Sequence, residues 1–375
     1  MANSQDSRWM RLALAEAARG QGSVEPNPMV GAVIVRDNQA IGVGHHAVYG
    51  KDHAEVAAIK NCTQSTMGAT IHVTLEPCCH HGKTPPCVDS ILKAGLRRVV
   101  VATADPFPQV NGGGIQRLRE AGVLVEIWPE SSDIAADAVR LNLPFFKRVK
   151  TGRPFVIAKW AMSLDGRIAL ASGDSRWISN EKSRALVHEI RGRVDAIIVG
   201  IGTAMADNPS LTARPPGPRI PTRVVIDPRA GLPLESILVR TANEIPTWVF
   251  CSLNAERARL EQLYESGCKV VELKPDESGT IRPNDVLDHL GAAGMTNVLV
   301  EGGSRLLGRF FDDRAIDEVQ VFIAPVLFGG PASYPPIHGQ ELRPMEMVSR
   351  LTQVRRVQIG DDTLVTGLVS ELWKG

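Results

Sequence analysis

Two stretches of this 375-residue chain are the most informative about its fold: H-A-E at 53–55, and P-C-C-H-H-G-K-T-P-P-C at 77–87. The imidazole of His53 and the thiolates of Cys78 and Cys87 are ligands of the kinds that zinc takes in proteins. A structural zinc site closes with a fourth protein ligand, whereas a catalytic site leaves that position to water. Glu55 stands beside the histidine and is placed to move protons to and from that water. These residues predict one catalytic Zn²⁺ per chain.

The order of these residues matches a catalytic signature. H-x-E followed by P-C and a further cysteine is typical of zinc-dependent base deaminases, in which the glutamate transfers protons and is not a ligand. A lone buried cysteine or histidine usually serves only packing, but His53, Glu55, Cys78 and Cys87 occur together at motif spacing, which favours a metal centre. Cys79 is interpreted as a neighbour of the ligands, and His80 and His81 as loop residues near a substrate.

Strands and helices alternate around the two stretches. The pattern predicts helices at 6–20, 54–61 and 87–95, and strands within 27–35 and at 40–44, 71–77 and 97–103. Asp52 is the expected N-cap of the second helix, and Asp37-Asn38 is the expected hairpin turn. This order predicts an α/β fold with parallel strands and a site at their carboxyl ends, beside helix amino ends.

The chain is longer than one hydrophobic core usually serves, so we expect two domains. The basic stretch LNLPFFKRVKTGRP at 141–154 is interpreted as a linker, with domains at 1–148 and 149–375. The second half predicts its own strands at 194–200, 222–227, 247–251, 268–273, 297–303 and 318–325. Its clearest helices are expected at 283–293 and 304–313, and ARPPGPRIP at 213–221 is expected to be a loop.

The composition limits the partners and the cellular compartment that we expect for this protein. The formal net charge is +1 and aromatic residues make up 5%, so neither a basic field nor a stacking surface for nucleic acid is expected. The first twenty residues lack the apolar core of a signal peptide, and no apolar run approaches the ~20 residues that span a bilayer. Three of six cysteines crowd into 78–87, which suits metal binding in a reducing compartment. We expect a cytoplasmic protein without membrane or nucleic-acid partners.

Longer motifs carry a family resemblance. Eight residues, 79–86, separate the two cysteine ligands, where the deaminase signature has two. This loop follows T-L-E-P and, further upstream, N-P-M-V-G-A-V. The second half contains KWAMSLDGRIALASGDSRWIS at 159–179, VGIGTAMADNPSLTAR at 199–214 and VEGGSRLLGRF at 300–310. Together, and in this order, these motifs resemble the bifunctional deaminase/reductases of riboflavin biosynthesis over nearly the whole chain.

The resemblance implies a cytidine-deaminase-like three-layer α/β/α domain followed by a dihydrofolate-reductase-like α/β domain. It implies deamination of 2,5-diamino-6-(5-phosphoribosylamino)pyrimidin-4-one, a phosphoribosylaminopyrimidine, in the first domain. By motif position, Asn27, His46, Lys83 and Asp105 would contact that substrate. The family pattern D-P-N-P reads D-P-F-P here, with Phe107 in place of asparagine. Asn27 also suits a plain turn, and Lys83 a solvated charge.

The resemblance further implies that the second domain uses NADPH to reduce the ribosyl group to ribityl, and we expect a homo-oligomer. The residues implied along NADPH are Ala161, Trp177, Thr203, Asp207, Gly303, Ser304, Arg305, Leu306, Leu307, Gly308 and Arg309. The residues implied along the reductase substrate are Lys159, Ser175, Arg191, Leu211, Arg214 and Glu301. Arg191 and Arg214 suit a phosphate clamp, although each also suits an ion pair. Two glycine-containing turns, at 200–203 and 301–304, present backbone N–H groups to phosphate or serve only tight packing.

Two other functions compete with this interpretation. A deaminase of nucleic acid would carry a basic stripe and aromatic stacking residues, which the composition disfavours. A structural zinc module joined to a nucleotide-sensing domain would have no need of the acid at Glu55.

Overall fold

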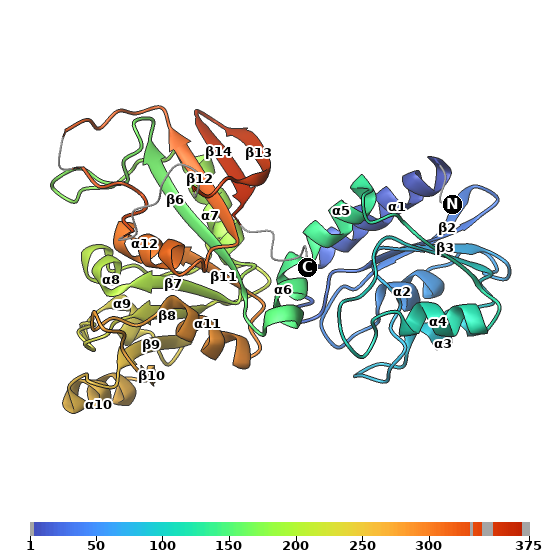
Figure 1. Cartoon of the computed structure of the whole chain (residues 1–375), viewed down its shortest axis with the longest axis horizontal. Coiled ribbons are helices and arrows are strands. Elements are labelled where there is room, and N and C mark those ends of the chain that lie inside the picture. The colour runs from blue at the N-terminus through green and yellow to red at the C-terminus, as the bar shows by residue number, and fades with distance from the viewer. Residues whose placement is uncertain (1–3, 331–332, 340–347, 370–375) are drawn as a thin grey trace. The chain divides into compact units, whose positions relative to one another are not determined.

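The computed structural model describes residues 4–330, 333–339 and 348–369. The chain forms two compact units, Met1–Thr151 and Gly152–Gly375, drawn from blue to green and from green to red in Figure 1. The basic stretch that we interpreted as a linker is largely helical, because α6 covers Leu143–Thr151 and belongs to the first unit. Pro144 stands in its first turn, where a missing N–H leaves no bond unmade. The division between the units follows the end of this helix.

The first unit contains one five-stranded sheet in the order β2-β1-β3-β4-β5. Its strands are β1 (Gly31–Arg36), β2 (Gln39–His45), β3 (Thr70–Val73), β4 (Arg98–Val101) and β5 (Leu124–Ile127). The expected hairpin is confirmed, since Asp37 and Asn38 join β1 to β2 with φ of 48° and 57°, the left-handed values of a tight hairpin turn. The parallel arrangement holds for β3, β4 and β5, whereas β1 runs antiparallel to β2 and β3.

Helices cover both faces of this sheet, which gives three layers. On one face α1 (Ser4–Ala17) and α5 (Asp133–Leu141) pack against Val33, Val35 and Val100. On the other face the neighbouring residues Ala32 and Ile34 pack against three helices. These are α2 (Ala54–Lys60), α3 (Cys87–Lys93) and α4 (Gly113–Glu120). Because successive strand residues point to opposite faces, strands apolar at every position are buried on both sides.

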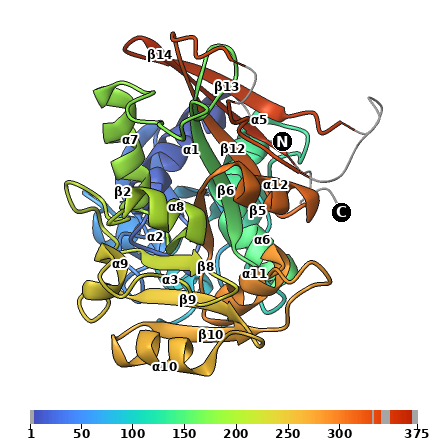
Figure 2. The ribbon, with the colours of Figure 1, turned by 90° about the vertical axis from the view of Figure 1, so that its left-hand side faces the viewer.

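The second unit contains one nine-stranded sheet in the order β10-β9-β8-β7-β11-β6-β12-β14-β13 (Figures 1 and 2). The strands are β6 (Phe155–Ser163), β7 (Ala196–Gly200), β8 (Thr222–Ile226), β9 (Thr247–Ser252), β10 (Lys269–Leu273), β11 (Asn297–Glu301), β12 (Glu318–Ala324), β13 (Thr352–Ile359) and β14 (Asp362–Leu368). All pairings from β10 to β12 are parallel, and β14 and β13 add an antiparallel edge. The six expected strands are confirmed, and the terminal hairpin was not expected.

The helices of this unit also lie on two faces. They are α7 (Glu181–Arg191), α8 (Ile201–Asp207), α9 (Ile237–Arg240), α10 (Arg257–Glu265), α11 (Pro283–Ala292) and α12 (Ser304–Asp312). Buried residues of α11 and α12 share one core with Val298 and Val300 of β11. Buried residues of α8, α9 and α10 share the opposite core with Leu299 of the same strand. The predicted helices at 283–293 and 304–313 are confirmed, and no helix or strand forms within 213–221.

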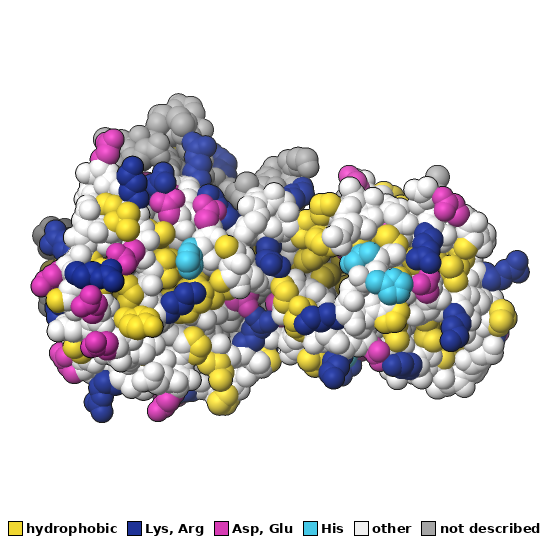
Figure 3. All heavy atoms as spheres, turned by 90° about the horizontal axis from the view of Figure 1, so that it is seen from below, with side chains coloured by type: hydrophobic (Ala, Val, Ile, Leu, Met, Phe, Trp, Pro, Cys, Tyr) yellow, Lys and Arg dark blue, Asp and Glu magenta, His cyan; other side chains and the backbone are white. Residues whose placement is uncertain are grey.

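The described surface carries charges of both signs. On the face drawn in Figure 3, Lys and Arg side chains are scattered among Asp and Glu side chains and do not form one continuous basic stripe. Among the residues described, no helix combines the length and the apolar character needed to cross a membrane.

Candidate functional site

The three expected zinc ligands meet in the first unit. Their ligand atoms lie within 4.8 Å of one another, with His53 Nδ1 3.6 Å from Cys78 Sγ and 3.3 Å from Cys87 Sγ. A tetrahedral zinc with ordinary bond lengths separates a nitrogen and a sulfur ligand by about 3.5 Å. The donor set and its spacing therefore fit a zinc ion with three protein ligands.

The three ligands lie at the start of α2, at the start of α3 and in the segment after β3. His53, rather than the expected Asp52, is the N-cap residue of α2 and makes no side-chain cap, which leaves its imidazole for the metal. Cys87 is the first residue of α3, because Pro85 and Pro86 precede it. Cys78 follows Pro77, beyond the end of β3 at Val73. The strand predicted at 71–77 is too long, because β3 ends at Val73, although the Glu76 N–H still bonds to the Thr103 carbonyl oxygen in the segment after β4.

Neighbouring groups shift the pKa values of the two cysteine ligands and orient the histidine ligand. A hydrogen bond from Cys87 lowers the pKa of the Cys78 thiol, and His53 adds to this effect. The same contact with Cys78, together with burial, raises the pKa of Cys87. The second ring nitrogen of His53, Nε2, lies 3.4 Å from Thr84 Oγ1. Such a partner fixes the tautomer that directs Nδ1 to a metal, so the 79–86 loop orients a ligand.

Glu55 lies in the first turn of α2 and is 3% exposed. Burial raises the pKa of its carboxyl group, and the negative charge of Cys78 raises it further. Its side chain also bonds to Cys87. A carboxyl group with a raised pKa takes up and releases a proton nearer neutral pH than an exposed one does, as a group that transfers protons requires.

Asn27 and His46 form a chain of contacts beside the ligands. The His46 ring lies 5.1 Å from the His53 ring, centroid to centroid. Its Nδ1 lies 2.9 Å from the Asp52 carbonyl oxygen, and its Nε2 lies 3.3 Å from the Asn27 amide nitrogen. Because a carbonyl only accepts, Nδ1 carries the proton, and Nε2 accepts from the Asn27 amide. The amide oxygen of Asn27 is then left to accept from another donor.

Lys83 and Asp105 lie in different surroundings. The exposed Lys83 ammonium lies 4.0 Å from the centre of the Tyr49 ring, a cation–π contact. Asp105 is buried, and this burial raises the pKa of its carboxyl group to about 7, although it accepts the Phe107 N–H. The Phe107 ring packs against His80 at 5.9 Å between centroids. Phe107, where the family pattern has asparagine, therefore makes an aromatic contact with the cysteine loop.

In the second unit, the two glycine-containing turns meet. β7 and β11 are parallel neighbours, and their carboxyl ends lead into α8 and α12. Thr203 Oγ1 accepts the Gly303 N–H at 3.1 Å, so the amino ends of both helices lie side by side. Gly303 is exposed, and Ser304 behind it is buried. The first N–H groups of a helix have no acceptor within the helix, so two adjoining helix amino ends favour a bound anion.

The expected substrate residues Lys159, Arg191 and Glu301 also meet. Lys159 and Glu301 occupy paired positions on β6 and β11. Arg191 makes two 2.7 Å hydrogen bonds with Glu301, and both side chains are less than 20% exposed. Although burial opposes ionisation, Arg191 lowers the pKa of Glu301 to about 2. Of the two arginines expected to clamp phosphate, Arg191 is paired with Glu301. Arg214 is exposed near Ser210 Oγ, at 3.4 Å.

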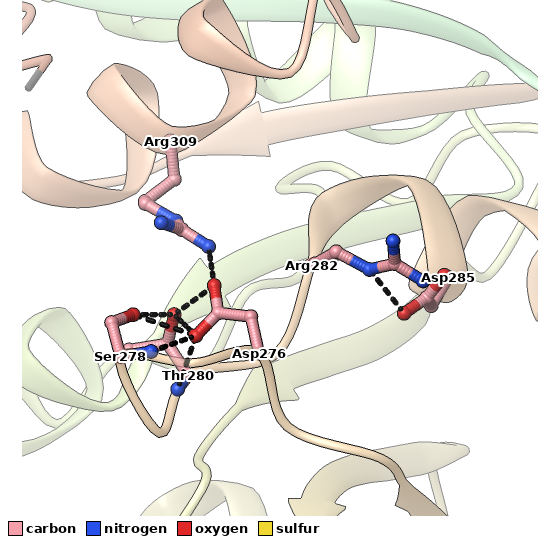
Figure 4. A network of polar contacts seen from close by, with 6 residues as sticks. All are labelled: Asp276, Ser278, Thr280, Arg282, Asp285 and Arg309. Atoms are coloured by element: carbon pink, nitrogen blue, oxygen red, sulfur yellow. Dashed lines mark hydrogen bonds and ion pairs between the residues drawn. The ribbon is translucent and has the colours of Figure 1, made fainter. Parts of the chain in front are cut away.

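The run from Gly303 to Arg309 lies along α12, and its two ends differ. Gly303 and Arg305 are exposed, whereas Leu307 is wholly buried in the core. A Cβ on Gly308 would meet the His338 carbonyl oxygen at 2.1 Å. Arg309 forms an ion pair with Asp276, and Asp276 also accepts hydrogen bonds from the turn at 278–280 (Figure 4). The exposed amino end of the run is therefore the part that faces solvent.

The remaining expected residues lie on β6, α8 and the loops near them. Ala161 is half-buried on β6, and Ser175 is half-buried in the loop before α7. Trp177 is 73% exposed, with Arg184 over its ring at 4.7 Å. The exposed Asp207 at the end of α8 pairs with Arg176. Leu211 is buried, with φ of 50°.

Sequence reasoning assigned no role to Glu76 or Tyr49. Glu76 was seen only as part of T-L-E-P, and its four backbone contacts join segments far apart in sequence. Tyr49 carries no motif, and its contact with Lys83 exists only in the folded unit. The contacts of these two side chains could be found only from the tertiary structure.

Family models match both units. Residues 3–103 match the cytidine and deoxycytidylate deaminase zinc-binding region, and residues 154–365 match the RibD C-terminal domain. The chain is 40% identical to the riboflavin biosynthesis protein RibD of Bacillus amyloliquefaciens, over 96% of this chain and 95% of that protein. It is 37% identical to RibD of Aquifex aeolicus, over 96% and 97%.

Solved structures agree with this assignment. RibD of Acinetobacter baumannii, form 1, superimposes with a TM-score of 0.83 at 36% identity, over 98% of this chain and 99% of that one. A Thermotoga maritima protein described as a diaminohydroxyphosphoribosylaminopyrimidine deaminase and 5-amino-6-(5-phosphoribosylamino)uracil reductase superimposes with a TM-score of 0.81 at 33% identity, with the same coverage. The chain therefore belongs to the RibD family of bifunctional deaminase/reductases in riboflavin biosynthesis, with a zinc-binding, cytidine-deaminase-like first domain and a RibD reductase domain.

Proposed function

We propose that the first unit deaminates 2,5-diamino-6-(5-phosphoribosylamino)pyrimidin-4-one and that the second reduces the ribosyl group of the product with NADPH. The observation that carries the first half is the meeting of His53, Cys78 and Cys87 around one point, with the buried Glu55 against Cys87. The solved Thermotoga maritima relative, named for both activities, supports the choice of substrate.

In the deaminase unit, His53, Cys78 and Cys87 would hold a zinc ion. Bound there, zinc would supply a water of lowered pKa as the nucleophile. The carboxyl group of Glu55 would take up a proton and pass it to the amino nitrogen that leaves as ammonia. Asn27, with its amide nitrogen engaged by His46, presents an acceptor oxygen to an amino group of the pyrimidine.

The outer part of the same substrate meets a cation. Lys83 is the exposed ammonium at the rim of the cysteine loop, and the Tyr49 ring restrains it. It binds the phosphoribosyl phosphate by charge. Asp105 and Phe107 lie on the neighbouring loop and border the pyrimidine.

In the reductase unit, the adjoining amino ends of α8 and α12 bind a phosphate group of NADPH through exposed N–H groups. NADPH, when bound, supplies the hydride. Lys159 and Glu301, paired on neighbouring strands, contact the ribosyl oxygens. The ion pair with Arg191 keeps Glu301 ionised, so that it accepts hydroxyl protons. Arg214 is the exposed cation available to the substrate phosphate.

One incubation tests the whole proposal. The purified chain is mixed with the diaminopyrimidine phosphate, with and without NADPH, while ammonia and NADPH absorbance are followed. Ammonia release without NADPH, and NADPH oxidation only after deamination, are expected. NADPH oxidation without prior ammonia release would contradict the order of the steps, and no ammonia with zinc bound would contradict the substrate.

A further inference from the structure

Glu76 is a buried carboxylate that no ligand or proton-transfer role uses. Its side chain is 3% exposed, and it lies after β3, two residues before Cys78. Its Oε2 accepts the N–H groups of Asp105 at 3.3 Å and Gly112 at 3.0 Å. Its Oε1 accepts those of Gly114 at 3.0 Å and Ile115 at 3.1 Å. Within the described residues, no Lys or Arg forms an ion pair with it.

These four bonds fasten one loop to another. β3 and β4 are parallel neighbours, so the segment after β3, with Glu76, lies beside the segment after β4, with Asp105. Gly112, Gly114 and Ile115 form the amino end of α4, whose N–H groups have no partners within the helix. A carboxylate suits this place because the helix dipole favours negative charge there. Each oxygen accepts two bonds, so both are needed.

The amino end of α4 also packs closely against the segment that follows β3. A Cβ on Gly114 would meet the Pro77 carbonyl oxygen at 2.0 Å, so only glycine permits this approach. Further along α4, Arg117 bonds to the Cys79 carbonyl oxygen at 3.4 Å and to Asp89 of α3 at 2.5 Å. The segment 105–117 is thus fixed against both segments that carry cysteine ligands.

From this geometry we infer that Glu76 is a positioning residue for the pyrimidine side of the deaminase site. Through its bonds it sets the place of the 105–112 loop, which carries Asp105 and Phe107 beside the metal centre. Glu76 itself touches neither substrate nor metal. The inference rests on the proposed deaminase function, and it concerns substrate binding rather than proton transfer.

The test is Glu76→Gln in the full-length, zinc-loaded chain. An amide offers one acceptor oxygen and turns an NH₂ group toward two N–H donors, so one pair of bonds is lost. We expect KM for the diaminopyrimidine phosphate to rise roughly tenfold or more as the loop shifts, while zinc stays at one per chain. Reductase kinetics on the deaminated intermediate should not change, which checks that the second unit is intact, while the zinc content reports on the first unit.

A change in KM distinguishes a positioning role of Glu76 from an effect on the stability of the first unit alone. Partial unfolding lowers the concentration of active sites, and with it the apparent kcat, but leaves KM unchanged. Glu76→Asp keeps the charge and shortens the reach, so a smaller rise in KM is expected, and it is the deciding variant if Glu76→Gln loses zinc. Gly114→Ala would push the amino end of α4 away from Pro77 and should also raise KM. Glu120→Gln, on the exposed side of α4, is the matched control and should behave as wild type.

Unchanged KM in the zinc-retaining variants would overturn the inference, whether kcat stays constant or falls with zinc content. Failure of the proposed function is distinguishable, because the wild-type chain would then release no ammonia from this substrate.

Discussion

Nε2 of His46 lies 3.3 Å from the amide nitrogen of Asn27, and Nδ1 of the same ring lies 2.9 Å from the Asp52 carbonyl oxygen. The backbone before a metal ligand thus sets the tautomer of His46, and the tautomer sets the orientation of the Asn27 amide. The acceptor that Asn27 presents is fixed before any substrate arrives.

Replacement of His46 with Ala should release that orientation. We expect KM for the pyrimidine to rise roughly five- to tenfold, the value of one lost hydrogen bond, with little change in zinc content. Steady-state ammonia release measures it. His45→Ala is the matched control, because His45 contacts Glu16 of α1 at 3.1 Å and not Asn27. An equal effect of both variants would contradict this role of His46.

Glu55→Gln should stop deamination while leaving the metal in place. The amide is nearly the same size but cannot hold a proton for transfer, so a loss of roughly a hundredfold to ten-thousandfold in kcat is expected. Ammonia release and zinc content per chain are the measurements. Deamination at the wild-type rate, with zinc retained, would remove Glu55 from the mechanism.

Asp105→Asn should stabilise the first unit as pH rises. Burial raises the folded pKa of Asp105 from 3.8 to about 7, so the folded state holds the proton more tightly than the unfolded state does. Its ionisation therefore costs stability as pH rises from about 4 to 7, up to about 4 kcal/mol in all. Denaturant unfolding of the zinc-loaded variant and wild type at pH 5 and pH 8 checks this. The stability difference should be larger at pH 8, and a difference independent of pH would contradict it.

Arg191→Ala should lower the stability of the second unit, whereas Arg214→Ala should weaken its reductase activity. Removal of Arg191 leaves a buried Glu301 without its partner and should lower the free energy of unfolding by about 3 kcal/mol or more. The folded pKa of Glu301 is lowered from 4.5 to about 2, so its stabilisation is present above pH 4.5 and is lost as pH falls toward 2. That acid-dependent loss should disappear in Arg191→Ala. Unfolding curves between pH 2 and pH 6 measure it.

Arg214→Ala should leave stability unchanged, because its side chain is exposed. It should instead weaken the reductase step, with KM for the phosphorylated intermediate raised roughly tenfold by loss of a charge-assisted contact. NADPH oxidation at varied substrate concentration measures this. Unchanged kinetics would remove Arg214 from the site.

The residue pattern alone was enough to predict the chemistry of the metal centre and the alternation of strands with helices. His53, Glu55, Cys78 and Cys87 lie at spacings that local structure accounts for, since two prolines delay α3 to Cys87 and a helix start carries His53. A short run of apolar residues indicates a strand without knowledge of its partner, which is why the strands from β7 to β12 were predicted.

The pairing of polar groups that lie far apart in sequence could be seen only in the folded chain. Glu76 joins two loops because the parallel neighbours β3 and β4 bring together segments that are separated in sequence by a whole helix. Arg191, at the end of α7, pairs with Glu301, at the end of β11. The helical character of 143–151 was also missed, since its proline and basic residues resemble those of a linker. Local spacing carries information about ligands on adjacent turns, but the partner of a buried charge depends on which strands lie side by side.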